Sequence, residues 1–154
     1  MSSIDHPHIR RLGADDLGAM HGLLDLFARV FEDHESYSCA RPDAAYLTRL
    51  LAEPTFFAIV AEVSGVVIGG LAAYELRKFE QARSEIYLYD LGVLEAWRRK
   101  GIATRLIDAL RAEATRIGAW VIFVQADYID PPAIALYEKL GTREEVLHFD
   151  IALH

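Results

Sequence analysis

Two periodicities divide the chain into helix-like and strand-like segments. Four segments repeat apolar residues every three to four positions and are bounded by Asp, Pro or Gly, which is typical of amphipathic helices. These predicted helices begin near Asp15, Pro42, Ile102 and Pro131 and end near Phe31, Pro54, Gly118 and Gly141. Runs rich in Val, Ile, Leu and aromatic residues predict six strands, over 9–12, 56–63, 66–76, 85–93, 119–126 and 146–151. Together they predict one three-layer α/β domain over residues 1–154, with a mixed sheet.

Two short glycine-containing segments sharpen this outline. Ser64 and Gly65 separate two strand-like runs, which predicts a tight hairpin. Gly69 and Gly70 lie inside the second run, and paired glycines in a strand indicate a bulge or the close approach of another group.

Composition and charge narrow the classes of function. The chain has 154 residues, of which 53% are hydrophobic, and one cysteine, Cys39, so we expect no intrachain disulfide. The first ten residues are polar and no run is long enough to span a membrane, so we expect a soluble cytoplasmic protein. The net charge of −7 argues against nucleic acid as a partner and suits a cationic substrate. The six histidines show no metal-ligand spacing, and we expect no metal.

A basic turn joins a predicted strand to the longest predicted helix. It reads Arg98-Arg99-Lys100-Gly101, after an Ile-, Tyr- and Leu-rich run. The first N–H groups of a helix have no intrahelical partner and carry partial positive charge, so such a turn predicts an anion site. It matches neither the P-loop nor the dinucleotide pattern, because each requires more glycines. The alternative is an ordinary turn with solvated basic residues.

This turn, Arg98 to Ala103, resembles the pyrophosphate loop [Q/R]-x-x-G-x-[G/A] of the GNAT acetyltransferase superfamily. The segment A-L-Y-E-K-L-G over 135–141 and the order of elements are similar to the same superfamily. The resemblance implies the three-layer GNAT fold, with a mixed, mostly antiparallel sheet and helices on both faces, and acetyl-CoA as acetyl donor. It also implies a set of cofactor-binding residues: Leu91, Val93, Arg98, Arg99, Gly101, Ala103, Thr104, Asp130 and Ala133.

Two further blocks are similar to the class I aminoglycoside 3-N-acetyltransferases. They lie at 79–91 and 125–151. The resemblance implies acetyl transfer to the 3-amino group of an aminoglycoside, which is antibiotic resistance, by direct attack in a ternary complex. It also implies a possible homodimer, because the last strand of this fold often lies at a subunit contact.

Acetyl transfer requires a group that takes a proton from the amine and a group that protonates the leaving thiolate. Asp90 lies in the apolar run Tyr87-Leu88-Tyr89-Asp90-Leu91, where burial would raise its pKa, and we expect it to be the base. The alternative is a carboxylate that satisfies backbone groups at a strand bulge. The family resemblance implies that Tyr137 is the acid; the alternative is a helix tyrosine in the core.

A polycationic acceptor needs carboxylates and aromatic rings around it. The candidate substrate-binding residues are Asp33, Glu35, Glu80, Glu85, Tyr87, Asp127, Tyr128 and Asp150. Taken singly, each is more typical of a solvated surface, whereas the family resemblance implies that together they form an acidic rim. Other acceptors remain open, namely a polyamine, another small amine or a protein amine. A non-catalytic acyl-CoA-binding module is a further alternative.

Overall fold

The computed structural model describes residues 6–154. The chain divides into two compact units, one that ends at Phe123 and one over Val124–His154, and each is described by itself. The strands are β1 (His8–Arg11), β2 (Phe56–Val63), β3 (Val66–Arg77), β4 (Ser84–Val93) and β5 (Val121–Val124). The helices are α1 (Leu17–Val30), α2 (Ala44–Ala52), α3 (Ile102–Ile117) and α4 (Pro131–Leu140), with the short turns η1 (Glu35–Cys39) and η2 (Glu95–Trp97).

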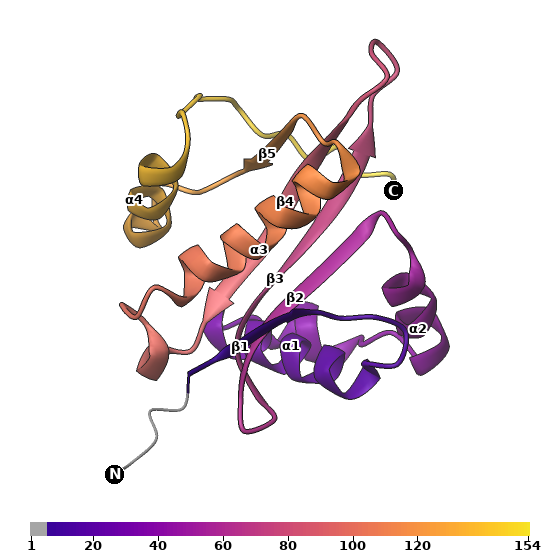
Figure 1. The fold of residues 1–154 in the computed structure, drawn as a ribbon, viewed down its shortest axis with the longest axis vertical. Helices are drawn as coiled ribbons and strands as arrows, with labels where there is room; N and C mark the ends of the chain where they lie inside the picture. Colours follow the sequence, from indigo (N-terminus) through magenta and orange to yellow (C-terminus); the bar gives the residue numbers. More distant parts are fainter. Residues whose placement is uncertain (1–5) are drawn as a thin grey trace. The chain divides into compact units, whose positions relative to one another are not determined.

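The five strands form one sheet in the order β1-β2-β3-β4-β5, and the first four pair antiparallel (Figure 1). Ser64 and Gly65 connect β2 to β3, and both have positive φ, at 50° and 78°. Two such residues form the hairpin turn whose twist matches that of paired strands, as the sequence predicts. The α/β architecture expected from the sequence is confirmed.

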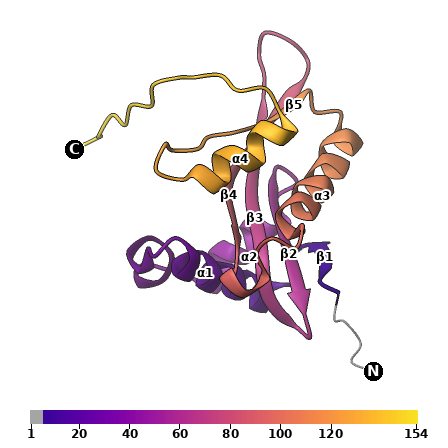
Figure 2. The same ribbon diagram turned by 90° about the vertical axis from the view of Figure 1, so that its left-hand side faces the viewer.

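Helices cover the two faces of the sheet in the first unit. Leu23 and Leu26 of α1 and Leu47 and Leu51 of α2 share a buried cluster with β2 and β3. The helix α3 lies across the opposite face, as Figure 2 shows, and buries Leu106 and Leu110 completely. Each face therefore has its own apolar core, and the buried apolar side chains Ile86 and Leu88 of β4 belong to the one under α3.

The glycine pair in β3 has both of the predicted properties. The register of β3 against β2 shifts between Gly69 and Val67, which leaves Ile68 without a partner. A Cβ on Gly70 would lie 3.0 Å from the carbonyl oxygen of Ile59 and would also collide with Leu23 of α1. Glycine therefore allows α1 to pack directly on the sheet.

The predicted last strand is wrong. Residues 141–154 form neither helix nor strand, although apolar and polar side chains alternate there. The large apolar side chains of this segment are exposed: Val146, Leu147, Phe149, Ile151 and Leu153. Alternation describes only the side chains, whereas a strand also needs a neighbouring backbone to bond with, and within residues 124–154 this segment has none.

Candidate active site

A bulge in β4 brings two chemically useful side chains to one face of the sheet. Asp90 pairs with Ala72 of β3, whereas Leu88 pairs with Ala73, so Tyr89 has no partner. Ala72 belongs to the cluster under α1, and directly paired residues share a face of the sheet. Tyr89 and Asp90 therefore both lie on the α1 side, where regular alternation would have separated them.

Asp90 is half-buried and hydrogen-bonded to a residue far away in the sequence. The hydroxyl of Tyr37, which lies 53 residues earlier on η1, donates to Asp90 Oδ2 at 3.0 Å. Burial raises the pKa of Asp90, and the Tyr37 hydrogen bond opposes this rise because it stabilises the charged form. The structure thus has the partly desolvated carboxylate that the sequence predicts, and Asp90 remains the candidate base.

Aromatic rings border this carboxylate. The Tyr74 and Tyr89 ring centroids are 5.9 Å apart, and those of Tyr87 and Tyr89 are 5.4 Å apart. Tyr87 also stacks on Phe123 at 4.6 Å. Burial, and then the charge of Asp90, raise the pKa of Tyr74, so the Tyr74 phenol stays neutral at physiological pH. A carboxylate beside several electron-rich rings is an arrangement that binds an organic cation.

The predicted anion site lies at the start of α3. Gly101 precedes the helix with φ of 76°, and Arg99 also has positive φ, at 61°. Among residues 6–154 no side-chain hydrogen bond caps the start of this helix, whereas Asp43 and Asp130 cap α2 and α4 by accepting from the N–H groups of Tyr46 and Ala133. The first N–H groups of α3 are therefore available to an external anion.

In this basic turn, Arg98 contacts a backbone carbonyl group and Lys100 contacts an aromatic ring. Arg98 and Lys100 are exposed, yet Arg98 Nε donates to the Val93 carbonyl oxygen at 3.2 Å. The Lys100 ammonium lies over the Trp97 ring, 5.0 Å from its centroid. Arg98 thus ties the end of β4 to the turn, while its charge stays at the surface. This exposed, uncapped turn fits a diphosphate.

Among the predicted substrate carboxylates of the first unit, Asp33 is hydrogen-bonded to the turn that contacts Asp90. Its backbone oxygen accepts from the Tyr37 N–H at 3.3 Å, and its side chain accepts from the Ser36 N–H at 3.0 Å. Glu35 begins the same turn, so both acidic residues lie on the segment that contacts Asp90. Asp33 therefore has a structural role, since its two contacts shape the turn that carries Tyr37.

Glu80 and Glu85 lie at the other end of the β3–β4 hairpin. Both carboxylates pair with Lys78, at 3.3 Å and 3.6 Å from its Nζ atom. Glu85 and Asp90 are five positions apart on β4, which is about 16 Å along an extended strand. The structure does not bring these two carboxylates to Asp90.

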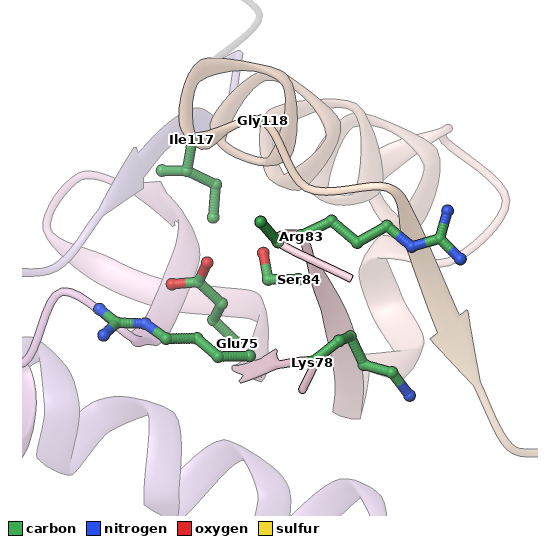
Figure 3. Close-up of a pocket in the computed structure, with 8 residues that line it drawn as sticks. Glu75, Lys78, Arg83, Ser84, Ile117 and Gly118 are labelled. Carbon is green, nitrogen blue, oxygen red and sulfur yellow. The ribbon is translucent and has the colours of Figure 1, made fainter. Parts of the chain in front are cut away.

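Near that end of β4 is a cavity of about 290 Å³. Figure 3 shows Glu75 and Ser84 on its wall, below Ile117 and Gly118 at the end of α3. The Arg83 guanidinium lies over the Trp120 ring at 3.6 Å. Because Ser84 opens β4 and Asp90 lies near its far end, this cavity is separate from the candidate site.

The remaining candidates belong to the second unit and are described within it. Asp130 caps α4, its Oδ1 atom accepting from the Ala133 N–H at 3.3 Å, and Tyr137 is half-buried on that helix. The Tyr128 hydroxyl donates to Glu145 at 2.6 Å. Asp127 accepts from the Ile129 N–H at 3.3 Å, and Asp150 pairs with His148 at 2.8 Å. In this unit, therefore, side chains that carry charge also organise their own loops.

Sequence reasoning missed three members of the site, Tyr37, Tyr74 and Tyr89. Tyr37 lies in a polar segment that predicts only a loop, and its contact with Asp90 spans 53 positions. Tyr74 and Tyr89 carry a signal in the sequence, because tyrosines dominate this part of the hairpin. The sequence does not show the bulge in β4, and without the bulge the tyrosines that share a face with Asp90 cannot be identified.

A family model decides the broader identity of the chain. The model of the acetyltransferase (GNAT) family matches residues 20–142. The chain belongs to the GNAT acetyltransferase family. The GNAT fold expected from the sequence is thereby confirmed. Members of this family bind acetyl-CoA.

Solved structures of aminoglycoside acetyltransferases are similar to this acetyltransferase. One, HMB0005 from an uncultured soil metagenomic sample, is 53% identical with a TM-score of 0.94, over 96% of this chain and 99% of that one. Another, meta-AAC0020 from an uncultured soil metagenomic sample, was solved with sisomicin. It is 33% identical with a TM-score of 0.89, over 97% of each chain.

The curated relatives include acetyltransferases of another description. An N-alpha-acetyltransferase of Sulfurisphaera tokodaii is 33% identical over 103 residues, which is 60% of this chain. The chain spans 58% of the length of the curated relatives that it matches over the longest stretches. Within residues 6–154, no helix is long and apolar enough to cross a bilayer. The same residues contain no group of three metal-ligating side chains.

Proposed function

We propose that this protein transfers the acetyl group of acetyl-CoA to an amino group of an aminoglycoside, at the 3-amino position of the deoxystreptamine ring. The observation that carries the proposal is Asp90, a half-buried carboxylate among tyrosine rings on the face that α1 covers. An aminoglycoside is a polycation, and its protonated amines suit such surroundings. The 53% identical aminoglycoside acetyltransferase supports this acceptor class, and the 3-amino position comes from the sequence resemblance alone.

In this proposal Asp90 prepares the acceptor for attack. The carboxylate takes a proton from the substrate ammonium, either directly or through water, which leaves a neutral amine with a free electron pair. A pKa raised by burial makes the carboxylate a better proton acceptor than an exposed aspartate. A bound ammonium pulls the same pKa down, so binding of the substrate keeps Asp90 ionised until the proton moves.

The chemistry then needs no enzyme nucleophile. The amine nitrogen bonds to the carbonyl carbon of the thioester, the carbon–sulfur bond breaks, and the departing thiolate takes a proton that we assign to Tyr137. The nitrogen, now positively charged, loses its second proton to water or to the Tyr137 phenolate, which leaves the neutral amide. Backbone N–H groups between Leu91 and Val93 would hold the developing oxyanion. Cys39 is exposed on η1 and has no part in this direct transfer.

The start of α3 is the proposed site for the pyrophosphate of acetyl-CoA. The N–H groups of Arg99, Gly101, Ala103 and Thr104 would receive it, since no side chain caps this helix. The Arg98 and Lys100 charges would add longer-range attraction. In the second unit, Asp130 and Ala133 stay candidates for cofactor contact through the start of α4.

Acidic and aromatic residues would line the acceptor site. Asp33, Glu35 and Tyr87 are the members of the proposed set within the first unit near Asp90, whereas Glu80 and Glu85 lie by Lys78. Asp127, Tyr128 and Asp150 remain proposals within the second unit. Asp33, Glu35 and Tyr87 are therefore the residues to substitute first.

A second candidate acceptor is the N-terminal amine of a protein. The N-alpha-acetyltransferase relative supports it, although that match covers 60% of this chain. Polyamines form a third class, because an acidic site attracts any organic cation. A non-catalytic acyl-CoA-binding module is less well supported, since such a module has no need of a buried carboxylate.

The test is thiol release from acetyl-CoA with four acceptors in parallel: gentamicin, kanamycin, spermidine and a peptide with a free N-terminus. A reaction without acceptor gives the background. Strong stimulation by gentamicin, with the product acetylated at the 3-amino group, is the expected result. Stimulation by the peptide alone or by spermidine alone would mean that the acceptor is a protein N-terminus or a polyamine and not an aminoglycoside. Binding of acetyl-CoA without stimulation by any acceptor would favour the non-catalytic binding module.

A further inference from the structure

The proposed mechanism gives no role to one hydrogen bond of the candidate site, the one between Tyr37 and Asp90. Tyr37 of η1 donates its hydroxyl proton to Asp90 Oδ2 at 3.0 Å, and both residues are half-buried. A hydrogen bond that spans 53 positions fixes a turn between two helices against the middle of the sheet. Such a contact deserves a functional explanation, because it uses the carboxylate that would accept the substrate proton.

The phenol of Tyr37 is held firmly by its surroundings. Its ring lies 5.7 Å from both Phe27 and Phe31, measured between centroids. Its carbonyl oxygen accepts from Arg41 Nη2 at 3.0 Å, and the same nitrogen donates to Asp25 of α1 at 2.7 Å. The ring and the backbone are thus tied to α1 separately, so the hydroxyl has a fixed position from which to act on Asp90.

We propose that Tyr37 is a positioning residue for the base: its hydroxyl holds Oδ2 of Asp90, so that Oδ1 faces the acceptor amine. This inference rests on the proposed function, in which Asp90 takes the proton of the substrate ammonium. Oδ1 makes no hydrogen bond within residues 6–154. The two carboxylate oxygens therefore have separate tasks, one to orient the group and one to accept the proton.

Only one proton moves in this arrangement of Asp90 and Tyr37. The ammonium proton moves to Oδ1, and Tyr37 keeps its own proton throughout. Burial and the charge of Asp90 raise the pKa of Tyr37, so the phenol remains a donor over the whole range in which the enzyme works. Tyr37 is therefore not a proton relay.

Other groups near Asp90 act on it less directly. Tyr74 of β3 and Tyr87 of β4 are within electrostatic range of its charge, and Asp33 acts on Tyr37. Burial is the larger influence on the pKa of Asp90, and the Tyr37 hydrogen bond is the one that lowers it. Loss of the Tyr37 hydroxyl alone would therefore raise the proton affinity of Asp90 and leave its orientation free.

Tyr37→Phe tests this directly, because it removes the hydroxyl and keeps the ring beside Phe27 and Phe31. The first readout is the titration of the Asp90 carboxyl carbon by ¹³C NMR in the free protein, with the signal assigned from Asp90→Asn. The second is the pH profile of kcat/KM with gentamicin. Tyr46→Phe, the same change at an exposed tyrosine of α2, is the matched control.

We expect the Asp90 midpoint to rise in Tyr37→Phe and the acid limb of kcat/KM to move to higher pH. At pH 6 the loss of kcat/KM should be on the order of tenfold, and much of it should return at pH 9. Tyr46→Phe should change neither measurement. A merely structural role for Tyr37 would lower activity equally at every pH.

The outcomes separate this inference from the proposed function. If Asp90→Asn abolishes turnover while Tyr37→Phe keeps the wild-type midpoint and acid limb, the positioning role is wrong and the proposed function stands. Normal turnover in Asp90→Asn would overturn both. Equal loss of kcat/KM at all pH values in Tyr37→Phe would also overturn the positioning role.

Discussion

The two faces of the sheet in the first unit carry very different side chains. On the α3 side, β4 contributes Ile86 and Leu88, which are almost inaccessible to solvent. On the α1 side the same strand contributes Tyr87, Tyr89 and the half-buried Asp90. One strand thus supplies an apolar core on one side and a polar, aromatic site on the other. A single bulge can thus place two polar side chains next to each other on one face of a strand while the opposite face keeps its buried apolar side chains.

Asp90→Asn is the substitution with the largest expected effect, because it removes the proposed base from the α1 side of the sheet. The amide cannot accept a proton, so we expect kcat with gentamicin to fall by about 10²- to 10⁴-fold. Steady-state thiol release measures the loss, and circular dichroism checks that the fold is retained. Near-normal turnover at both neutral and alkaline pH would remove the base role from Asp90.

Leu110→Ala makes a comparable change on the other face. Leu110 of α3 is fully buried, and its truncation should cost about 2–5 kcal/mol of unfolding free energy through lost burial and a cavity. Denaturant titration measures this cost. Below the unfolding transition the pH profile of kcat/KM should keep its wild-type shape. A shifted acid limb would mean that the two faces are coupled.

Gly101→Glu tests the start of α3, and Gly118→Glu is its control at the other end of the same helix. Both glycines have positive φ, at 76° and 73°, and a Cβ at either position would meet open space. The backbone strain is therefore matched, and only the distance to the proposed pyrophosphate differs. We expect the Kd for CoA to rise about tenfold or more for Gly101→Glu and to stay unchanged for Gly118→Glu, by calorimetry. Equal affinities in the two variants would place the pyrophosphate elsewhere.

The smallest expected effect is a gain of stability when the Asp90 charge is removed. Burial raises the folded-state pKa of Asp90 above its unfolded value, so the charged form opposes folding. The favourable contribution is complete below the unfolded pKa, about 3.9, and is lost as pH rises through the folded pKa. Asp90→Asn should therefore melt slightly higher than wild type at pH 7, and the difference should reverse or vanish near pH 3. A variant that melts lower than wild type at pH 7 would contradict this sign.

Much of the first unit could be predicted from the sequence because its signals are local. The Ser64-Gly65 hairpin, the glycine before α3 and the close approach at Gly70 each follow from the conformations that glycine allows. Helical spacing located α1, α2, α3 and α4 to within a few residues. In each case the residues that determine the element lie within or beside it.

The features that escaped prediction depend on residues far apart in the sequence. Regular alternation places Tyr89 and Asp90 on opposite faces, and only the pairing with β3 reveals the bulge that unites them. Tyr37 gains its role from a contact 53 positions away, which no local pattern contains. The wrong strand over 146–151 has the same cause, since alternation does not supply a partner backbone.

The central claim is that the half-buried carboxylate of Asp90, on the α1 side, drives acetyl transfer to an aminoglycoside. The most direct test is the pH profile of kcat/KM for gentamicin, from acetyl-CoA thiol release, for wild type and Asp90→Asn together. The account predicts a wild-type profile whose acid limb lies above the range of an exposed aspartate, and an Asp90→Asn profile that is flat and orders of magnitude lower. Superimposable profiles, or no release stimulated by gentamicin at any pH, would contradict it.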